Sequence, residues 1–245
     1  SMGLGELRPW DSRAQIVEYA LEGSMEEVQA ARPLAHMTLR GFADELASGS
    51  PAPGGGSVAA LAGALAAGLA AMVPSLTVGR KGYKDVEAEM NALAAEAQQI
   101  KDALLEAIDD DTAAFNALMD SLRLPKNSEA ETEARDVAIA AATRGATDVP
   151  LSVLERMPRL LELLQVCAER GNSNALSDAV TGSAMALACA TGAHANVLIN
   201  LRGMAQDEWT AATLARAEDV LRKVRHAHDV LLSTAMPVLQ APPTD

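Results

Sequence analysis

Apolar residues recur at the spacing of one helical face through most of the chain, and no stretch alternates apolar and polar residues as a half-buried strand would. Short runs rich in Gly, Pro and Ser separate these segments. The pattern predicts helices over roughly 11–20, 38–46, 57–73, 85–122, 128–149, 150–170, 175–202 and 207–236, with one boundary at Pro150 and a left-handed cap at Gly171. We therefore expect an all-α fold in a single domain over 1–245, with a lead-in helix and linker at 1–36 and a tail at 237–245.

The segment between Leu46 and Gly79 contains no charged residue. It is long enough to span a bilayer, but residues 57–73 are mainly Ala and Gly, which gain little from contact with lipid. Small residues on all sides suit a helix that is enclosed by other helices. We therefore expect a buried Ala/Gly-rich central helix in a multihelical bundle, N-capped by Ser57, and no membrane span.

Composition supports the helical interpretation and limits the partners. Aromatic residues make up 2% of the chain, too few for an aromatic-rich sandwich core, which excludes all-β architectures. The net charge of −13 opposes binding to nucleic acid or to an anionic membrane. Cys167 and Cys189 both lie in apolar helical sequence, as core residues of a reducing compartment do. No secretory leader pattern is found, so the expected location is the cytoplasm.

Three consecutive acids, Asp109, Asp110 and Asp111, interrupt the middle of the predicted helix 85–122. With a helical turn of about 100° per residue, Asp111 falls on the apolar stripe that includes Ile108, whereas the other two acids point away. Asp109 and Asp110 therefore fit a solvated face. Asp111 has two interpretations: a structural carboxylate satisfied by an arginine or by backbone donors, or a general acid/base whose pKa is raised by apolar neighbours.

Four other polar clusters could line a ligand pocket, and each also has a structural explanation. They are the glycine-rich loop of Gly54, Gly55, Gly56 and Ser57, the turn with Asn172, Ser177 and Asp178, the amides Asn196 and Asn200 on one helix face, and the cations Arg80, Lys81 and Lys84. The structural explanations are a tight turn for the glycine loop, helix capping for the Asn172 turn, an interhelical hydrogen bond for the two amides, which is the commoner role of such residues, and a solvated turn for the cations. The four histidines lack the spacing of metal ligands, so we expect no metal site.

Eight segments, in order, resemble the cyclodeaminase domain of formiminotransferase-cyclodeaminase and the related helical methenyltetrahydrofolate cyclohydrolases. They are Leu7–Pro9 with Arg13 and Ile16–Tyr19, Pro53–Ser57, Thr77–Arg80, Asp109–Phe115, Leu124–Lys126, Val149–Pro150, Gly171–Asn172 with Ser177–Asp178, and Asn196–Arg202. The resemblance covers most of the chain. It implies a multihelical fold around a buried central helix, a homodimer, and a tetrahydrofolate derivative as the substrate, with no cofactor.

By this resemblance the catalytic aspartate of the family corresponds to Asp111, judged from its spacing to Phe115. The residues that would line the pteridine pocket are Gly54, Gly55, Gly56, Ser57, Asn172, Ser177, Asp178, Asn196 and Asn200, and those that would meet the folate glutamate are Arg80, Lys81 and Lys126. The resemblance also leaves open a separate formiminotransferase as a partner.

The expected function is that of a formiminotetrahydrofolate cyclodeaminase, which forms 5,10-methenyltetrahydrofolate and ammonia. One buried carboxyl group can accept the proton of N10 and donate it to the departing nitrogen. Two alternatives stay open. The first is a methenyltetrahydrofolate cyclohydrolase that uses the same pocket, and the second is a non-catalytic helical interaction module, for which Ala-rich packing surfaces and an acidic exterior suffice.

Overall fold

The computed structural model describes residues 33–242, and the regular structure in this range is helical, without a β-strand. The elements are η1 (Leu34–His36), α3 (Leu39–Leu46), α4 (Gly55–Ser75), η2 (Lys84–Val86), α5 (Glu87–Leu122), α6 (Glu129–Arg170), η3 (Ser173–Ala175), α7 (Leu176–Leu201) and α8 (Glu208–Gln240). The all-α prediction is confirmed. The helix predicted at 11–20, like most of the lead-in segment 1–36, lies outside the described residues.

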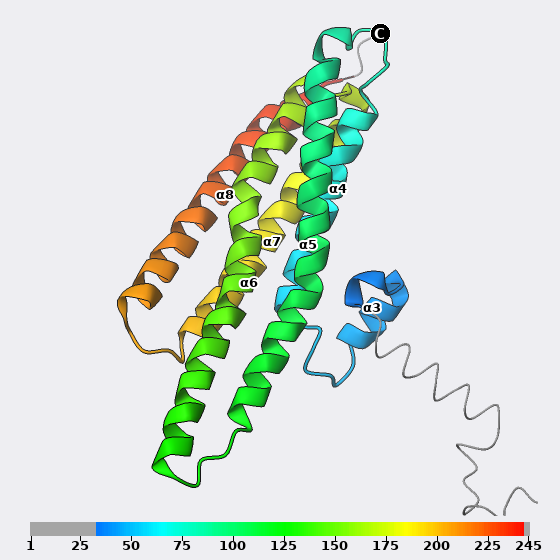
Figure 1. The fold of residues 1–245 in the computed structure, drawn as a ribbon. Helices are drawn as coiled ribbons and strands as arrows, with labels where there is room; N and C mark the ends of the chain where they lie inside the picture. The colour runs from blue at the N-terminus through cyan, green and yellow to red at the C-terminus, as the bar shows by residue number, and fades with distance from the viewer. Residues whose placement is uncertain (1–32, 243–245) are drawn as a thin grey trace, which may run out of the picture.

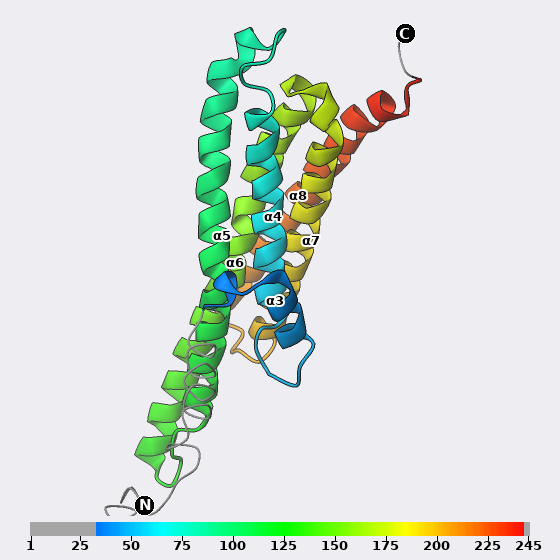
Figure 2. The same ribbon diagram turned by 90° about the vertical axis from the view of Figure 1, so that its right-hand side faces the viewer.

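Helices α4 to α7 form an elongated bundle, and α8 packs along α6 and α7 (Figure 1). Helix α4 lies between α5 and α7 and also contacts α6 across the core (Figure 2). Helices α5 and α6 continue as an antiparallel pair beyond the N-terminal end of α4, while α3 lies beside that end. Long antiparallel helices joined by short turns are the usual construction of such bundles.

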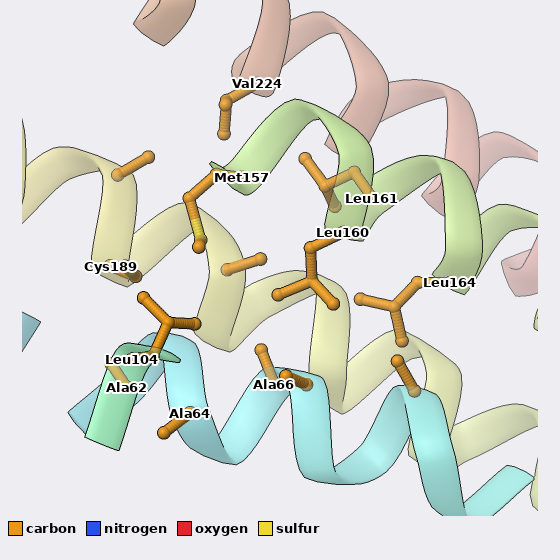
Figure 3. Packing of buried hydrophobic residues seen from close by; sticks show 14 of the residues in the cluster. Ala62, Ala64, Ala66, Leu104, Met157, Leu160, Leu161, Leu164, Cys189 and Val224 are labelled. Atoms are coloured by element: carbon orange, nitrogen blue, oxygen red, sulfur yellow. The ribbon is translucent and has the colours of Figure 1, made fainter. Parts of the chain in front are cut away.

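Helix α4 is the buried central helix that the uncharged segment predicts. Of its 21 residues, 13 are buried, and most of these are Ala or Gly. The small side chains let bulky residues of three neighbouring helices pack against it (Figure 3). At Gly63 an added β-carbon would come within 2.9 Å of Cys189 Sγ and 3.1 Å of Leu104 Cδ1, so glycine permits the observed helix spacing. By length and composition α4 would pass as a membrane span, as would Ser173–Leu201, but 67% of the α4 window is buried inside the protein.

Helix α6 runs unbroken through Pro150 and Pro158, so the predicted boundary at Pro150 is wrong. Proline disfavours a helix interior because it lacks the N–H group that would bond the carbonyl four residues earlier. In this helix the carbonyl left free by Pro150 belongs to Ala146, and it accepts a hydrogen bond of 2.7 Å from Nδ2 of Asn200 on α7. The side chain of Asn200 thus supplies the donor that Pro150 lacks.

Three helix ends also differ from the prediction. Helix α4 begins earlier than expected, with Gly54 as its N-cap, so Ser57 lies inside the first turn with its side chain buried. Gly171 ends α6 with an extended backbone, φ −77° and ψ 179°, and not with a left-handed cap. Glycine is needed there because an added β-carbon would come within 2.4 Å of a carbonyl oxygen in the preceding turn. Helix α8 continues through Pro237, which the prediction assigned to the tail.

Candidate active site

Asp111 and Ser57 face each other where α5 passes the first turn of α4. The hydroxyl of Ser57 donates a hydrogen bond of 3.0 Å to Asp111 Oδ2 and also lies 3.3 Å from the carbonyl oxygen of Ile108. Ser57 is fully buried and Asp111 is half-buried. Asp111 forms no ion pair within residues 33–242, so an arginine-neutralised structural carboxylate does not fit this part of the chain.

Neighbouring side chains lie close to two glycines of the predicted loop, Gly55 and Gly56. An added β-carbon on Gly56 would overlap the Asp111 carboxylate, and one on Gly55 would lie 3.3 Å from Nδ2 of Asn196. Gly54 has open space around it and serves as the N-cap of α4. The first turn of α4 therefore packs directly on the carboxyl group, and its free backbone N–H groups lie at that end of the helix.

The environment of Asp111 changes its proton affinity. Burial raises the pKa of this carboxyl above its usual value, and the hydrogen bonds from Ser57 oppose the rise. Desolvation disfavours the charged form, whereas a donated hydrogen bond favours it. The net result is a carboxyl group that retains its proton to a higher pH than an exposed aspartate, as suits a group that must both accept and release a proton.

Asp109 holds the segment before α3 against α5. Its Oδ1 accepts a hydrogen bond of 2.6 Å from the backbone N–H of Leu34, and its Oδ2 accepts one of 3.4 Å from that of Ala35. The expectation of a merely solvated Asp109 is therefore wrong, because η1 folds over α5 and uses this carboxylate as its cap. Asp110 is exposed, as expected.

Thr112 was missed by the sequence analysis and adjoins Asp111. Its Oγ1 atom is buried and has no hydrogen-bond partner within the described residues. The hydroxyl of a threonine inside a helix commonly donates to the carbonyl four residues earlier. For Thr112 this is the carbonyl of Ile108, which the Ser57 hydroxyl also approaches. The position could have been found from its place one turn after Ile108 on the apolar stripe.

Only one of the two predicted amide side chains, that of Asn196, lies against the glycine-rich start of α4. Asn196 lies against Gly55 and donates a hydrogen bond of 2.8 Å to the carbonyl of Gly192. The Nδ2 group of Asn200 is instead occupied by Ala146 on α6. The two amides share a helix face, as predicted, but they contact different neighbours.

The remaining predicted ligand residues lie far from Asp111 within one chain. Those at the C-terminal end of α4 are Arg80, Lys81, Asn172, Ser177 and Asp178 (Figure 1). A helix of 21 residues measures about 30 Å, so this group is separated from the Asp111 site by the length of α4. Lys126 lies in the turn between α5 and α6, about three helical turns past Asp111 in the opposite direction.

Asn172 has a structural environment. Its side chain is buried, its backbone N–H donates to Thr77 Oγ1 at 2.9 Å, and its Nδ2 donates to the carbonyl of Leu76 at 3.1 Å. These bonds tie the turn between α6 and α7 to the end of α4.

The two cysteines are residues of the core. Cys167 and Cys189 are free and buried, as predicted, and burial raises the pKa of both thiols to about 12. Between residues 33 and 242 no three His, Cys, Asp or Glu side chains gather as a metal ion would require.

A helical bundle that packs one half-buried carboxyl group against a glycine-rich helix start is a scaffold suited to acid/base chemistry on a small ligand. Residues 38–219 match the sequence profile described as formiminotransferase-cyclodeaminase. The match covers well over half of the chain, and the chain belongs to the formiminotransferase-cyclodeaminase family.

The relatives are folate-metabolising enzymes by name. The chain is 36% identical over 197 residues to a methenyltetrahydrofolate cyclohydrolase of Methylorubrum extorquens, which covers 80% of this chain and 95% of that protein. It is 35% identical over 224 residues to the mouse formimidoyltransferase-cyclodeaminase, covering 91% of this chain but 41% of the mouse protein. A crystal structure of a formiminotetrahydrofolate cyclodeaminase from Thermotoga maritima matches with a TM-score of 0.75 and 28% identity, over 83% of this chain and 98% of that one.

Proposed function

We propose that the protein is a formiminotetrahydrofolate cyclodeaminase with Asp111 as its general acid/base. The observation that carries the proposal is the half-buried Asp111 carboxyl, with its raised pKa, beside the glycine-rich start of α4. The family and the names of the relatives support folate chemistry. We further propose that Gly55, Ser57 and Asn196 contact the pterin end of the substrate.

The chemistry requires one proton carrier. N10 of protonated 5-formiminotetrahydrofolate attacks the formimino carbon and forms the new C–N10 bond, and the Asp111 carboxylate accepts the proton released from N10. The protonated carboxyl then donates this proton to the formimino nitrogen, the C–N bond to that nitrogen breaks, and ammonia leaves with 5,10-methenyltetrahydrofolate as the product. A pKa raised toward the working pH suits both transfers.

A cyclohydrolase is the second candidate, because a relative with this name matches over 95% of its length. In that reaction water adds to the methenyl carbon and loses a proton to Asp111. The hydroxyl group on this carbon then releases its proton to solvent as the C=O bond forms and the bond to N5 breaks, the proton held by Asp111 passes to N5, and 10-formyltetrahydrofolate is the product. The same carboxyl serves both reactions, so the geometry of the site is compatible with each.

Two assays on the purified protein separate these functions. Ammonia release from 5-formiminotetrahydrofolate, together with the appearance of methenyl absorbance, is the expected result. Loss of methenyl absorbance from 5,10-methenyltetrahydrofolate, without activity on the formimino substrate, would establish the cyclohydrolase instead. If neither folate binds saturably in calorimetry, the proposal fails and the helical interaction module becomes the better account.

A further inference from the structure

The hydroxyl of Ser57 lies between two acceptors. Its Oγ atom is 3.0 Å from Oδ2 of Asp111 and 3.3 Å from the carbonyl oxygen of Ile108. A hydroxyl group has one proton to donate and two lone pairs that accept. The carbonyl of Ile108 already accepts the helical bond from the backbone N–H four residues later, so one of its lone pairs remains for a side chain. Ser57 can therefore serve only one of its two acceptors at a time.

The protonation state of Asp111 decides which acceptor Ser57 uses. A charged carboxylate only accepts hydrogen bonds, so it takes the Ser57 proton. A protonated carboxyl can instead donate to the Ser57 oxygen, and Ser57 then donates its own proton to Ile108. The same three heavy atoms are hydrogen-bonded in both states. Proton transfer at Asp111 therefore requires the Ser57 hydroxyl to rotate but no heavy atom of this trio to move.

Thr112 is a second candidate donor for the Ile108 carbonyl. Inside a helix a threonine hydroxyl has a rotamer that donates to the carbonyl four residues earlier. Six threonines in the helices of the described chain adopt it, at distances of 2.7–3.1 Å: Thr132, Thr143, Thr147, Thr181, Thr191 and Thr234. Thr112 does not, although its Oγ1 is buried and has no other partner among residues 33–242. The difference is that the Ser57 hydroxyl lies beside the carbonyl that Thr112 would use.

We propose that Thr112 is a positioning residue for the Asp111 acid/base, and that the hydroxyls of Thr112 and Ser57 exchange the Ile108 carbonyl each time the carboxyl gains or loses a proton. While Asp111 is protonated, Ser57 donates to the carbonyl and Thr112 has no acceptor. When Asp111 is charged, Ser57 donates to the carboxylate, and rotation about χ1 of Thr112 brings its hydroxyl to the carbonyl that Ser57 has left.

The exchange favours the charged state of Asp111. A buried hydroxyl without a partner costs free energy, and Thr112 is in this condition only while the carboxyl is protonated. Thr112 therefore acts in the same direction as Ser57, against the rise that burial causes in the pKa of Asp111. The two hydroxyls together keep the proton of a half-buried carboxyl available for release.

No charged group within residues 33–242 acts on Asp111 beside these hydroxyls. The titratable residues on the elements packed around it are Asp109 and Asp110 on α5, His36 on η1, and Arg144 and Asp148 on the facing stretch of α6, whereas the first turn of α4 has none. The pKa of Asp111 responds to burial and to Ser57, and to none of these charges. A change in this pKa therefore reports on the hydroxyl network.

The pKa of Asp111 tests the exchange directly and without a substrate. NMR titration of protein labelled with carbon-13 at the aspartate carboxyls measures it, and Asp111→Asn identifies the signal. Thr112→Val removes the hydroxyl but keeps the shape of the side chain, so the pKa of Asp111 should rise by about 0.5–1. Thr112→Ser keeps the hydroxyl and should retain the wild-type pKa. An unchanged pKa in Thr112→Val would overturn the proposal.

Two further variants guard against a merely structural effect. Thr143→Val is the matched control, because Thr143 donates to the carbonyl of Ile139 on α6, and it should leave the pKa of Asp111 unchanged. Thr112→Ala lacks the hydroxyl without adding bulk and should raise the pKa as Thr112→Val does. A rise in Thr143→Val equal to that in Thr112→Val would overturn the proposal.

A double-mutant cycle distinguishes exchange through Ile108 from a direct contact between Thr112 and the carboxyl. In a Ser57→Ala background the Ile108 carbonyl is free in both protonation states, so Thr112 keeps its acceptor in both. Adding Thr112→Val to this background should therefore leave the pKa of Asp111 where Ser57→Ala puts it. The same rise as in the wild-type background would show a direct contact and refute the exchange.

The consequence for turnover rests on the proposed function. In Thr112→Val the acidic limb of kcat/KM should move to higher pH by as much as the pKa of Asp111 rises, and Thr112→Ser should restore the wild-type profile. A limb that stays in place although the pKa has risen would refute the proposed role of Asp111, while the NMR result still supported the exchange. An unchanged pKa in Thr112→Val, together with an inactive Asp111→Asn, would refute the exchange and leave the proposed function standing.

Discussion

A β-carbon added to Gly56 would lie 2.1 Å from Oδ1 of Asp111, closer than any non-bonded contact allows. The two residues are far apart in the sequence, one in the first turn of α4 and the other in the middle of α5. The Asp111 carboxylate can occupy its observed place against this turn only because position 56 has no side chain. The glycine thus sets the distance between the helix N-terminus and the carboxyl group, and that distance determines how deeply the carboxyl is buried.

Gly56→Ala should therefore displace the carboxyl and lower kcat by roughly 10²-fold or more, since the acid/base would no longer meet its substrate. The overpacking should also lower the free energy of unfolding by about 1–3 kcal/mol. The matched control is Gly54→Ala, because a β-carbon there meets no atom within 4 Å. Steady-state kinetics and urea unfolding of both variants give the comparison, and equal kinetics in the two would contradict the role given to Gly56.

Removing the hydroxyl of Ser57 should change the pH profile. The hydrogen bond from Ser57 lowers the pKa of Asp111 against the rise caused by burial. In Ser57→Ala the pKa of Asp111 should rise further, so the acidic limb of kcat/KM should move to higher pH. Ser121→Ala is a suitable control, since Ser121 is a buried serine on α5, the helix that carries Asp111, and its hydroxyl bonds the carbonyl of Leu118. An acidic limb that stays in place in Ser57→Ala would show that Asp111 does not control it.

The bond between Asn200 and Ala146 predicts a stability effect that depends on Pro150. Asn200→Ala leaves a carbonyl in α6 without its donor and should lower the free energy of unfolding by about 1–3 kcal/mol. In a Pro150→Ala background the new backbone N–H can bond Ala146 itself, so the same substitution should cost less. A double-mutant cycle by urea unfolding measures this coupling. Strictly additive effects would contradict the explanation for the unbroken helix.

The raised pKa of Asp111 also makes stability depend on pH. A carboxyl whose folded pKa exceeds its unfolded value stabilises the fold fully below the unfolded pKa, and this contribution is lost as the pH rises through the folded pKa. The Asp111→Asn side chain does not titrate, so the variant does not lose stability in this way. We therefore expect the free energy of unfolding of the variant, measured from pH 4 to pH 8, to rise relative to that of the wild type as the pH rises. The opposite trend would mean that the folded protein stabilises the charged form.

The pattern of small and apolar residues predicts much of this structure because it reports burial directly. The uncharged Ala/Gly segment identifies α4, and the phase of the helix 85–122 selects Asp111 from three adjacent acids. Both predictions depend only on which side of a helix faces the core. No knowledge of the neighbouring helices is needed for either.

Features that depend on a contact between distant segments could not be read from the sequence. Pro150 predicts a break, and only the position of Asn200 on α7 explains why the helix continues. Ser57 has the chemistry of an N-cap but instead bonds Asp111, and Asp109 meets η1. In each case the partner group lies on a segment distant in the sequence, and local helix propensity carries no information about such a contact.

Turnover by Asp111→Asn, with Asp110→Asn as its neighbouring exposed control, tests the central claim most directly. The substitution keeps the size of the side chain but removes its ability to carry the proton, so kcat should fall by roughly 10²–10⁴-fold while folate binding measured by calorimetry is retained. Asp110→Asn should turn over at the wild-type rate. An Asp111→Asn variant that releases ammonia, or opens the methenyl ring, as fast as the wild type would contradict the account.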